Sequence, residues 1–215
     1  MSWHPPSAQA VQIQGPAGVL EALLEEPQMS AHAGFAVICH PHPLHGGSMQ
    51  NKVVHTLARA CQAYGIATLR FNFRGVGASG GSYDEGRGEI QDALAVIAWG
   101  RARWPGVAMT LAGFSFGAMV SLGAANLAVP SKLISIAPAV FLPEFSAASD
   151  PRCPWLIVQG DADELVDIRD VRAFAARFVP PPQLVVFPGG EHFFHGRLSE
   201  LREQVLQFLK NEEAR

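Results

Sequence analysis

The sequence predicts an α/β protein in which one doubly wound, mostly parallel sheet carries helices on both faces. Short apolar, β-prone runs alternate with segments of helical period along nearly the whole chain, which is typical of this class. Of the 215 residues, 48% are hydrophobic and 16% are charged, as in a globular protein. No repeat interrupts the alternation, so we expect a single domain over residues 1–215.

The first predicted elements are a hairpin and a buried strand. Val11–Gln14 and Val19–Leu24 form the hairpin, with Gly15-Pro16 and Gly18 as turn residues. Gly34–Cys39 is apolar at every position, which is typical of a strand buried on both faces of a parallel sheet.

The other predicted strands are apolar runs, and the helices between them have recognisable ends. Gly65 closes the first helix and Asp167 is an N-cap. The strands are Ala67–Phe73, Val107–Phe114, Leu133–Ala137, Trp155–Gln159 and Leu184–Phe187. The helices are Asn51–Tyr64, Arg87–Arg103, Phe116–Leu127, Ile168–Phe178 and Leu198–Lys210. One apolar face of the second helix is predicted at Ile90, Leu94, Ile97 and Ala98.

The net charge and the cysteine content limit which partners and which cellular compartment we expect. The net charge is −3 and no dense basic run is present, which argues against nucleic acid or an anionic membrane as partner. Met1–Ala10 lacks the apolar core of a secretory signal, and no apolar stretch is long enough to span a bilayer. Cys39, Cys61 and Cys153 are too few for a disulfide framework. We therefore expect reduced cysteines and a cytoplasmic protein.

A nucleophile motif lies between a predicted strand and a predicted helix. Gly113-Phe114-Ser115-Phe116-Gly117 matches G-x-S-x-G, and its strand–turn–helix context is that of a nucleophile elbow. The serine sits on a sharp turn, and the N–H of Phe116 points toward a developing oxyanion. The alternative is a tight turn with a bystander serine.

The orienting carboxylate is expected after the strand Trp155–Gln159, because side chains at strand carboxyl ends meet at one edge of the sheet. Asp163 is the preferred candidate. Asp161 is its rival, and it could instead stabilise the turn. Asp167 has a structural role as a helix cap.

The general base is expected after the last strand, since the chain order in such sites is Ser, acid, His. His192 lies early in the loop and is the preferred candidate. His195 is the alternative, and its structural role would be that of a surface residue.

The loop after Gly34–Cys39 is expected to provide the second oxyanion donor. Pro41 and Pro43 have no N–H, so the donor is His42 or, as the alternative, Leu44.

The histidines of that loop, His40, His42 and His45, raise the alternative of a metal site. No Asp or Glu lies nearby in sequence, and Cys39 is assigned to the sheet. Loop packing, with one histidine shaping the pocket, is preferred, and no metal is expected.

With these residues in view, the chain resembles the α/β-hydrolase superfamily. Arg74–Ser79 is similar to its R-G-x-G-x-S turn and lacks the Lys-Ser/Thr of a phosphate loop. His40-Pro41-His42-Pro43 and Phe71-Asn72-Phe73 resemble a bacterial group of small, lidless predicted hydrolases akin to dienelactone hydrolases. The resemblance implies an eight-stranded sheet and a triad of Ser115, Asp163 and His192. Two departures are His40-Pro41 in place of His-Gly, and serine in place of the cysteine nucleophile of dienelactone hydrolases.

The expected function is hydrolysis of a small ester or thioester through an acyl-enzyme, with no metal or organic cofactor. The short connection between the strands at Leu133 and Trp155 leaves little room for a cap domain, so we expect an open site. His45, Phe114, Phe141 and Phe193 are candidate substrate contacts. The alternatives are a peptidase or acyltransferase with the same triad, a catalytically silent binding protein, and a metalloprotein.

Overall fold

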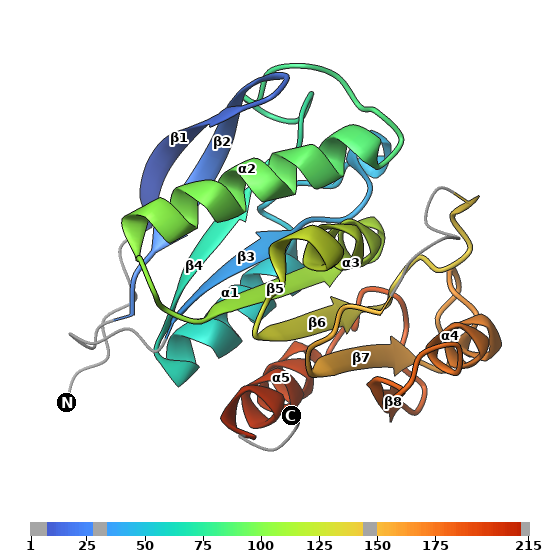
Figure 1. Ribbon diagram of the computed structural model, residues 1–215. Coiled ribbons are helices and arrows are strands. Elements are labelled where there is room, and N and C mark those ends of the chain that lie inside the picture. The colour runs from blue at the N-terminus through green and yellow to red at the C-terminus, as the bar shows by residue number, and fades with distance from the viewer. Residues whose placement is uncertain (1–7, 28–33, 144–149, 212–215) are drawn as a thin grey trace.

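The computed structural model contains one eight-stranded sheet, and it describes residues 8–27, 34–143 and 150–211 (Figure 1). The strand order is β1-β2-β4-β3-β5-β6-β7-β8. β2 is antiparallel to both β1 and β4, and the remaining neighbours are parallel, which confirms the predicted mostly parallel sheet. The strands are β1 (Gln9–Gly15), β2 (Gly18–Glu25), β3 (Gly34–Cys39), β4 (Ile66–Phe71), β5 (Met109–Phe114), β6 (Lys132–Ile136), β7 (Trp155–Gly160) and β8 (Gln183–Phe187).

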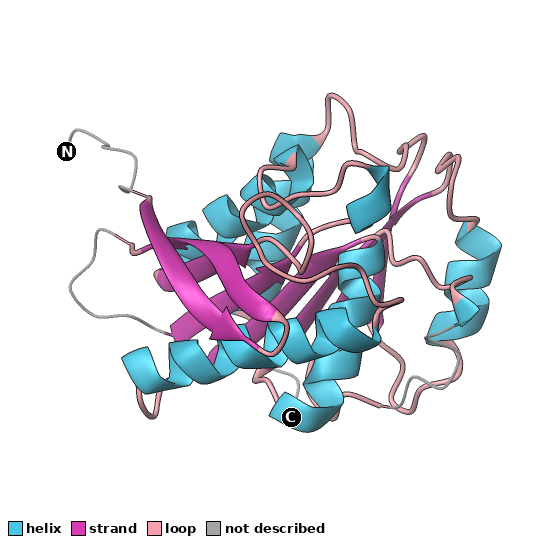
Figure 2. Ribbon diagram, turned by 90° about the horizontal axis from the view of Figure 1, so that it is seen from above, coloured by secondary structure: helices cyan, strands magenta, loops and turns pink. Residues whose placement is uncertain are grey.

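Helices cover both faces of the sheet (Figures 1 and 2). Their side chains divide between two hydrophobic clusters: α1 and α5 pack on one face, while α2, α3 and α4 pack on the other. β3, β5 and β7 are buried along their whole length between these layers. The helices are α1 (Lys52–Tyr64), α2 (Arg87–Arg103), α3 (Phe116–Ala128), α4 (Ile168–Ala175) and α5 (Leu198–Lys210), with a short 3-10 helix η1 (Pro43–His45).

The predicted helix ends depend on local chemistry, and most are confirmed. Gly65 ends α1 with φ 93°, a left-handed conformation that glycine adopts without strain. Asp167 caps α4 by accepting the N–H of Arg169 at 2.8 Å. α4 ends at Ala175 rather than Phe178, shortly before the prolines at 180–182.

The predicted apolar face of α2 is confirmed at three of its four positions: Ile97 is buried, and Ile90 and Leu94 pack partly buried against the core. Ala98 is exposed, so the prediction is wrong there. Two carboxylates, Glu89 and Asp92, are instead fully buried on the inner face. Burial of charge requires partners, and neither partner is visible in the periodicity of the helix.

Asp92 binds the turn that follows β4. Its carboxylate accepts Arg74 Nε at 2.9 Å and Nη2 at 2.8 Å, and also the backbone N–H of Arg74 at 3.0 Å. Gly75 and Gly77 in this turn have φ of 75° and 58°. Ser79 closes it by donating its hydroxyl to the Asn72 carbonyl at 2.7 Å. The R-G-x-G-x-S segment is therefore held as a turn against α2.

The connection between β6 and β7 includes residues 144–149, which lie outside the described residues, as do residues 1–7 of the N-terminal segment considered above. The described parts of the connection, 137–143 and 150–154, contain no α-helix or strand. Among the described helices, none combines the length and apolar character required to cross a bilayer.

Candidate active site

Ser115 lies on a sharp turn between β5 and α3, with φ 56°. A non-glycine residue at positive φ is strained, and such strain collects at functional sites. The two motif glycines permit the turn. A Cβ at Gly113 would lie 2.1 Å from the carbonyl oxygen of Gly117, and a Cβ at Gly117 would lie 2.3 Å from that of His40. The G-x-S-x-G spacing is thus a steric requirement of this turn.

The structure brings Ser115, His192 and Asp163 together from three separate segments of the chain. Ser115 Oγ lies 3.1 Å from His192 Nε2, and His192 Nδ1 lies 2.9 Å from Asp163 Oδ2. The side chains of His192 and Asp163 are 2% and 0% exposed. With the imidazole proton on Nδ1, Nδ1–H donates to the carboxylate and Nε2 accepts from the serine hydroxyl. This arrangement can deprotonate the serine as it attacks an electrophile.

The Asp163 carboxylate is surrounded by donors. Oδ1 accepts the N–H groups of Leu165 at 2.9 Å and Val166 at 2.8 Å. Oδ2 accepts Gln159 Nε2 at 2.8 Å as well as His192 Nδ1. Burial raises the pKa of Asp163, but His192 and the two backbone N–H groups outweigh it, and the net pKa lies below its ordinary value. Asp163 therefore stays ionised beside the imidazole.

The two rival residues lie elsewhere. Asp161 is exposed, and its Oδ1 accepts the N–H of Gly189 at 2.6 Å, which ties the loop after β7 to the loop after β8. The His195 side chain is 70% exposed, and its Nδ1 lies 3.1 Å from Glu191 Oε2. Neither belongs to the Ser115 hydrogen-bond chain. Asp161 instead helps to hold the loop that carries His192.

The loop after β3 is anchored through His40, which is fully buried. Its Nδ1 lies 2.6 Å from the Pro41 carbonyl, and its Nε2 accepts the N–H of Phe73 at 3.0 Å. Both ring nitrogens are occupied when the ring is neutral with its proton on Nδ1. Burial lowers the pKa of His40 to about 4, although the hydrogen bond to Pro41 acts in the opposite direction.

His42 lies against the nucleophile elbow. Its ring centroid is 4.9 Å from that of Phe116, and its Nε2 lies 3.3 Å from the Tyr83 hydroxyl. Its Nδ1 accepts the N–H of Leu44 at 3.2 Å. The loop after β3 and the start of α3 therefore meet beside Ser115, as an oxyanion hole requires.

Among the described residues, no others join the histidines of this loop in a group that could hold a metal ion. Within residues 8–27, 34–143 and 150–211, no group of three or more His, Cys, Asp or Glu side chains is placed to hold a metal ion. The rings of His42 and His45 pack together, with centroids 4.7 Å apart. The described cysteines are free, and Cys39 and Cys61 are buried.

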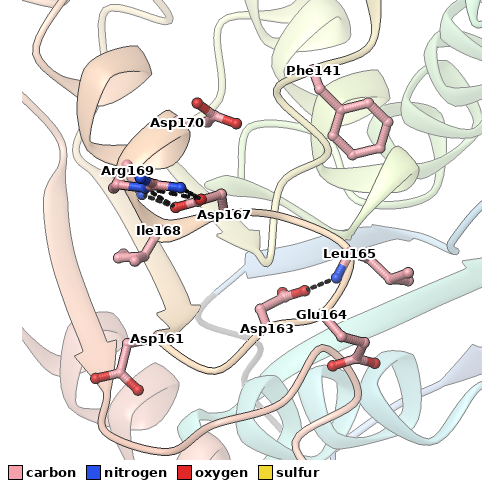
Figure 3. Close-up of a pocket in the computed structure, with 9 residues that line it drawn as sticks. All are labelled: Phe141, Asp161, Asp163, Glu164, Leu165, Asp167, Ile168, Arg169 and Asp170. Atoms are coloured by element: carbon pink, nitrogen blue, oxygen red, sulfur yellow. Dashed lines mark hydrogen bonds and ion pairs between the residues drawn. The ribbon is translucent and has the colours of Figure 1, made fainter.

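Two hollows flank the site. One of about 620 Å³ lies beside the loop that carries Asp163 and includes Phe141, which is 58% exposed (Figure 3). The other, of about 710 Å³, is lined by His42, His45 and Tyr83 among others. Phe193 is 38% exposed and packs edge-on against His192, with ring centroids 5.1 Å apart.

Phe114 is fully buried beneath the imidazole of His192, at 5.0 Å between centroids. It supports the ring and has no exposed surface for a substrate. Gln159, which contacts Asp163, and Tyr83, which contacts His42, were not among the predicted site residues. Gln159 carried a signal, a polar residue in an otherwise apolar strand, whereas Tyr83 carried none.

A doubly wound sheet with a serine elbow at the end of β5 defines the class of α/β hydrolases. Comparison with known proteins agrees. Residues 19–145 match the family model of the X-Pro dipeptidyl-peptidases (S15 family). The chain is 42% identical to an α/β serine hydrolase without a lid from Xanthomonas campestris, with TM-score 0.90 and coverage of 98% of this chain and 97% of that one. It is 47% identical to an α/β serine hydrolase homologue from Coxiella burnetii, with TM-score 0.90 and coverage of 96% and 99%.

The chain therefore belongs to the α/β serine hydrolases without a lid, and it carries an S15 family domain. A more distant structure, Est1E from Butyrivibrio proteoclasticus bound to ferulic acid, is 22% identical, with TM-score 0.82 and coverage of 93% of this chain and 98% of that one. At that identity the likeness extends to the fold alone.

Proposed function

We propose that the protein is a serine hydrolase that cleaves small carboxylic esters or thioesters through an acyl-enzyme on Ser115. The observation that carries the proposal is the continuous hydrogen-bond chain from Ser115 Oγ through His192 to Asp163. His192 takes the serine proton as Oγ attacks the acyl carbonyl and then delivers it to the leaving group. Asp163 orients the imidazole and stabilises its cationic form. Water then releases the acid by the same steps.

The oxyanion is held by the N–H groups of Phe116 and His42. Phe116 is the first residue of α3, where the helix dipole favours negative charge. The N–H of Leu44 already donates to His42 Nδ1, which favours His42 over Leu44 as the second donor. The anchoring of His40 at both ring nitrogens keeps this loop in place before substrate binds.

A small substrate is supported by the open edge of the sheet, because the described part of the connection between β6 and β7 adds no α-helix over Ser115. The ferulic acid in Est1E supports including aromatic acyl esters in the test panel. We expect p-nitrophenyl acetate and butyrate to be cleaved faster than the palmitate ester. A preference for the long chain contradicts the proposed substrate size.

The role of each residue is tested by labelling and kinetics. A fluorophosphonate probe should label the wild type and not Ser115→Ala, and labelling that survives in the variant overturns the assignment. Asp163→Asn should lower kcat about 10⁴-fold, as loss of the orienting carboxylate does in serine proteases. Asp161→Asn, the matched control in the same loop, should lower kcat less than about tenfold, because its exposed hydrogen bond to Gly189 only supports the loop.

Peptidase activity is the second candidate, and the match to the S15 family model favours it. The matched residues include the serine elbow and end before Asp163 and His192. The test is release of p-nitroaniline from X-Pro p-nitroanilides. A kcat/KM above that for the p-nitrophenyl esters would make the peptidase the principal activity.

A further inference from the structure

Gln159 is a fully buried polar side chain that the reaction scheme above does not use. It is the penultimate residue of β7, whose other side chains are apolar. Burying an amide is unfavourable unless it is hydrogen-bonded. Its partners therefore indicate what it contributes.

The amide nitrogen of Gln159 faces acceptors only. Nε2 lies 2.8 Å from Asp163 Oδ2, 3.1 Å from the Val166 carbonyl and 3.2 Å from the Gly160 carbonyl. The reverse orientation of the amide would direct Oε1 at a carboxylate and two carbonyl oxygens, which is repulsive. The donor end of the side chain must therefore face Asp163.

The other end of the amide is buried as well. Among the residues that the structure describes, no donor lies within hydrogen-bond distance of Gln159 Oε1. A buried carbonyl without a donor is destabilising, and such groups in native proteins call for an explanation. The hydrogen bonds that the structure shows for Gln159 are therefore all made by its donor end.

That donor end completes the environment of Asp163. Two backbone N–H groups bind Oδ1, and Gln159 and His192 share Oδ2. Donors on both oxygens fix the rotation of the carboxylate. Val166 links the contacts of the two carboxylate oxygens, since its N–H donates to Asp163 Oδ1 while its carbonyl accepts from Gln159, which binds Oδ2.

We propose that Gln159 is a positioning residue for the hydrolytic site: its amide holds the Asp163 carboxylate so that Oδ2 receives the Nδ1–H of His192. The inference rests on the proposed function, because it assigns Gln159 a role in the same hydrogen-bond chain. Gln159 acts through Asp163 and does not itself contact the substrate.

The first test replaces Gln159 with Met, which has similar length and neither the donor nor the unsatisfied carbonyl. We expect kcat to fall about 10- to 100-fold, the range for one lost hydrogen bond to a charged group, while KM changes less than about twofold. Because the unsatisfied carbonyl is lost as well, the melting temperature should change by less than about 4 °C. Gln183→Met is the matched control: Gln183 is exposed, lies at the start of β8 and should leave kcat unchanged.

The second test is Gln159→Glu, which keeps the shape and changes the charge. Two carboxyl groups in contact cannot both ionise readily, so the variant should bind a proton between them. Once that proton is lost, the added negative charge favours the protonated imidazole, and a neutral base forms only at higher pH. We expect the acid limb of the kcat/KM profile to move up by about one pH unit, with no such movement for Gln183→Glu.

A third measurement does not need activity. The low-field Nδ1–H resonance of a hydrogen-bonded imidazole should appear in the proton NMR spectrum of the wild type and shift upfield or broaden in Gln159→Met.

The proposal is overturned if both Gln159 variants keep the wild-type kcat and pH profile, or if they lose only thermal stability. If Gln159→Met does not fold, the pH profile of Gln159→Glu decides. If the wild type cleaves no ester and takes no fluorophosphonate, the proposed function fails, and the resonance still reports whether Gln159 holds Asp163.

Discussion

Mild acid should destabilise the folded protein through His40. The ring is fully buried, and in its neutral form both nitrogens are used, toward the Pro41 carbonyl and the Phe73 N–H. Protonation of Nε2 would direct a second N–H at the backbone N–H of Phe73, which already donates to that nitrogen. Burial is the main reason that the pKa of His40 falls to about 4.

The size of the effect follows from the two protonation states. The unfolded chain takes up the proton near pH 6.5, the ordinary pKa of histidine, while the folded protein resists it until about pH 4. Above pH 6.5 His40 is neutral in both the folded and the unfolded state, and it contributes no pH dependence to stability. As the pH falls below that value, the unfolded state is favoured, by about 2 kcal/mol at pH 5 and about 3 kcal/mol at pH 4.

The assay is urea unfolding between about pH 7 and pH 4.5, comparing wild type with His40→Gln. Glutamine offers a carbonyl oxygen to the Phe73 N–H and does not titrate. The variant should be less stable at pH 7, because ring packing against Phe73 is lost. Between pH 7 and pH 5, however, its free energy of unfolding should decrease by about 2 kcal/mol less than that of the wild type. His45→Gln, at an exposed position in the same loop, is the control and should follow the wild type. Parallel curves for wild type and His40→Gln would refute the reasoning.

Three further predictions concern other parts of the site and fold. Gly117→Ala should lower stability by about 1–3 kcal/mol and reduce fluorophosphonate labelling, since the new Cβ meets backbone oxygens that cannot move independently; unchanged labelling would contradict this. Asp92→Ala leaves Arg74 without its buried partner and should cost about 3–5 kcal/mol in urea unfolding, whereas a loss below about 1 kcal/mol would show that the ion pair is dispensable. The lowered pKa of Asp163 stabilises the fold above about pH 4, its ordinary range, and this contribution is lost as the pH falls through the folded value. The stability difference between wild type and Asp163→Asn, followed by circular dichroism, should therefore narrow as the pH falls below about 4.

Much of the fold was predictable because its signals are local. The strand Gly34–Cys39 and the helices Arg87–Arg103 and Leu198–Lys210 have the predicted bounds. Continuous apolar runs, capping side chains and turn glycines act within a few residues of their own position, so the sequence displays them directly.

The inner face of α2 was not predictable from period alone. Asp92 is buried because Arg74, eighteen residues earlier, reaches it across the turn after β4. A helical pattern reports hydrophobicity at its own positions and carries no information on such a partner. For Gln159 the sequence shows the polar residue in an apolar strand but not its role, because its partner Val166 is reached only after the chain has turned back.

The sequence by itself determined the succession of strands and helices along the chain, the serine elbow and the loops in which an acid and a base must lie. It left Asp161 as an alternative to Asp163, and His195 as an alternative to His192, because the members of each pair share a loop and a residue type. Only the tertiary structure separates them, since the distances of 3.1 Å and 2.9 Å join side chains from the ends of β5, β7 and β8. Hydrogen bonds act over one atomic contact, and which atoms come into contact is decided by the packing of the strands.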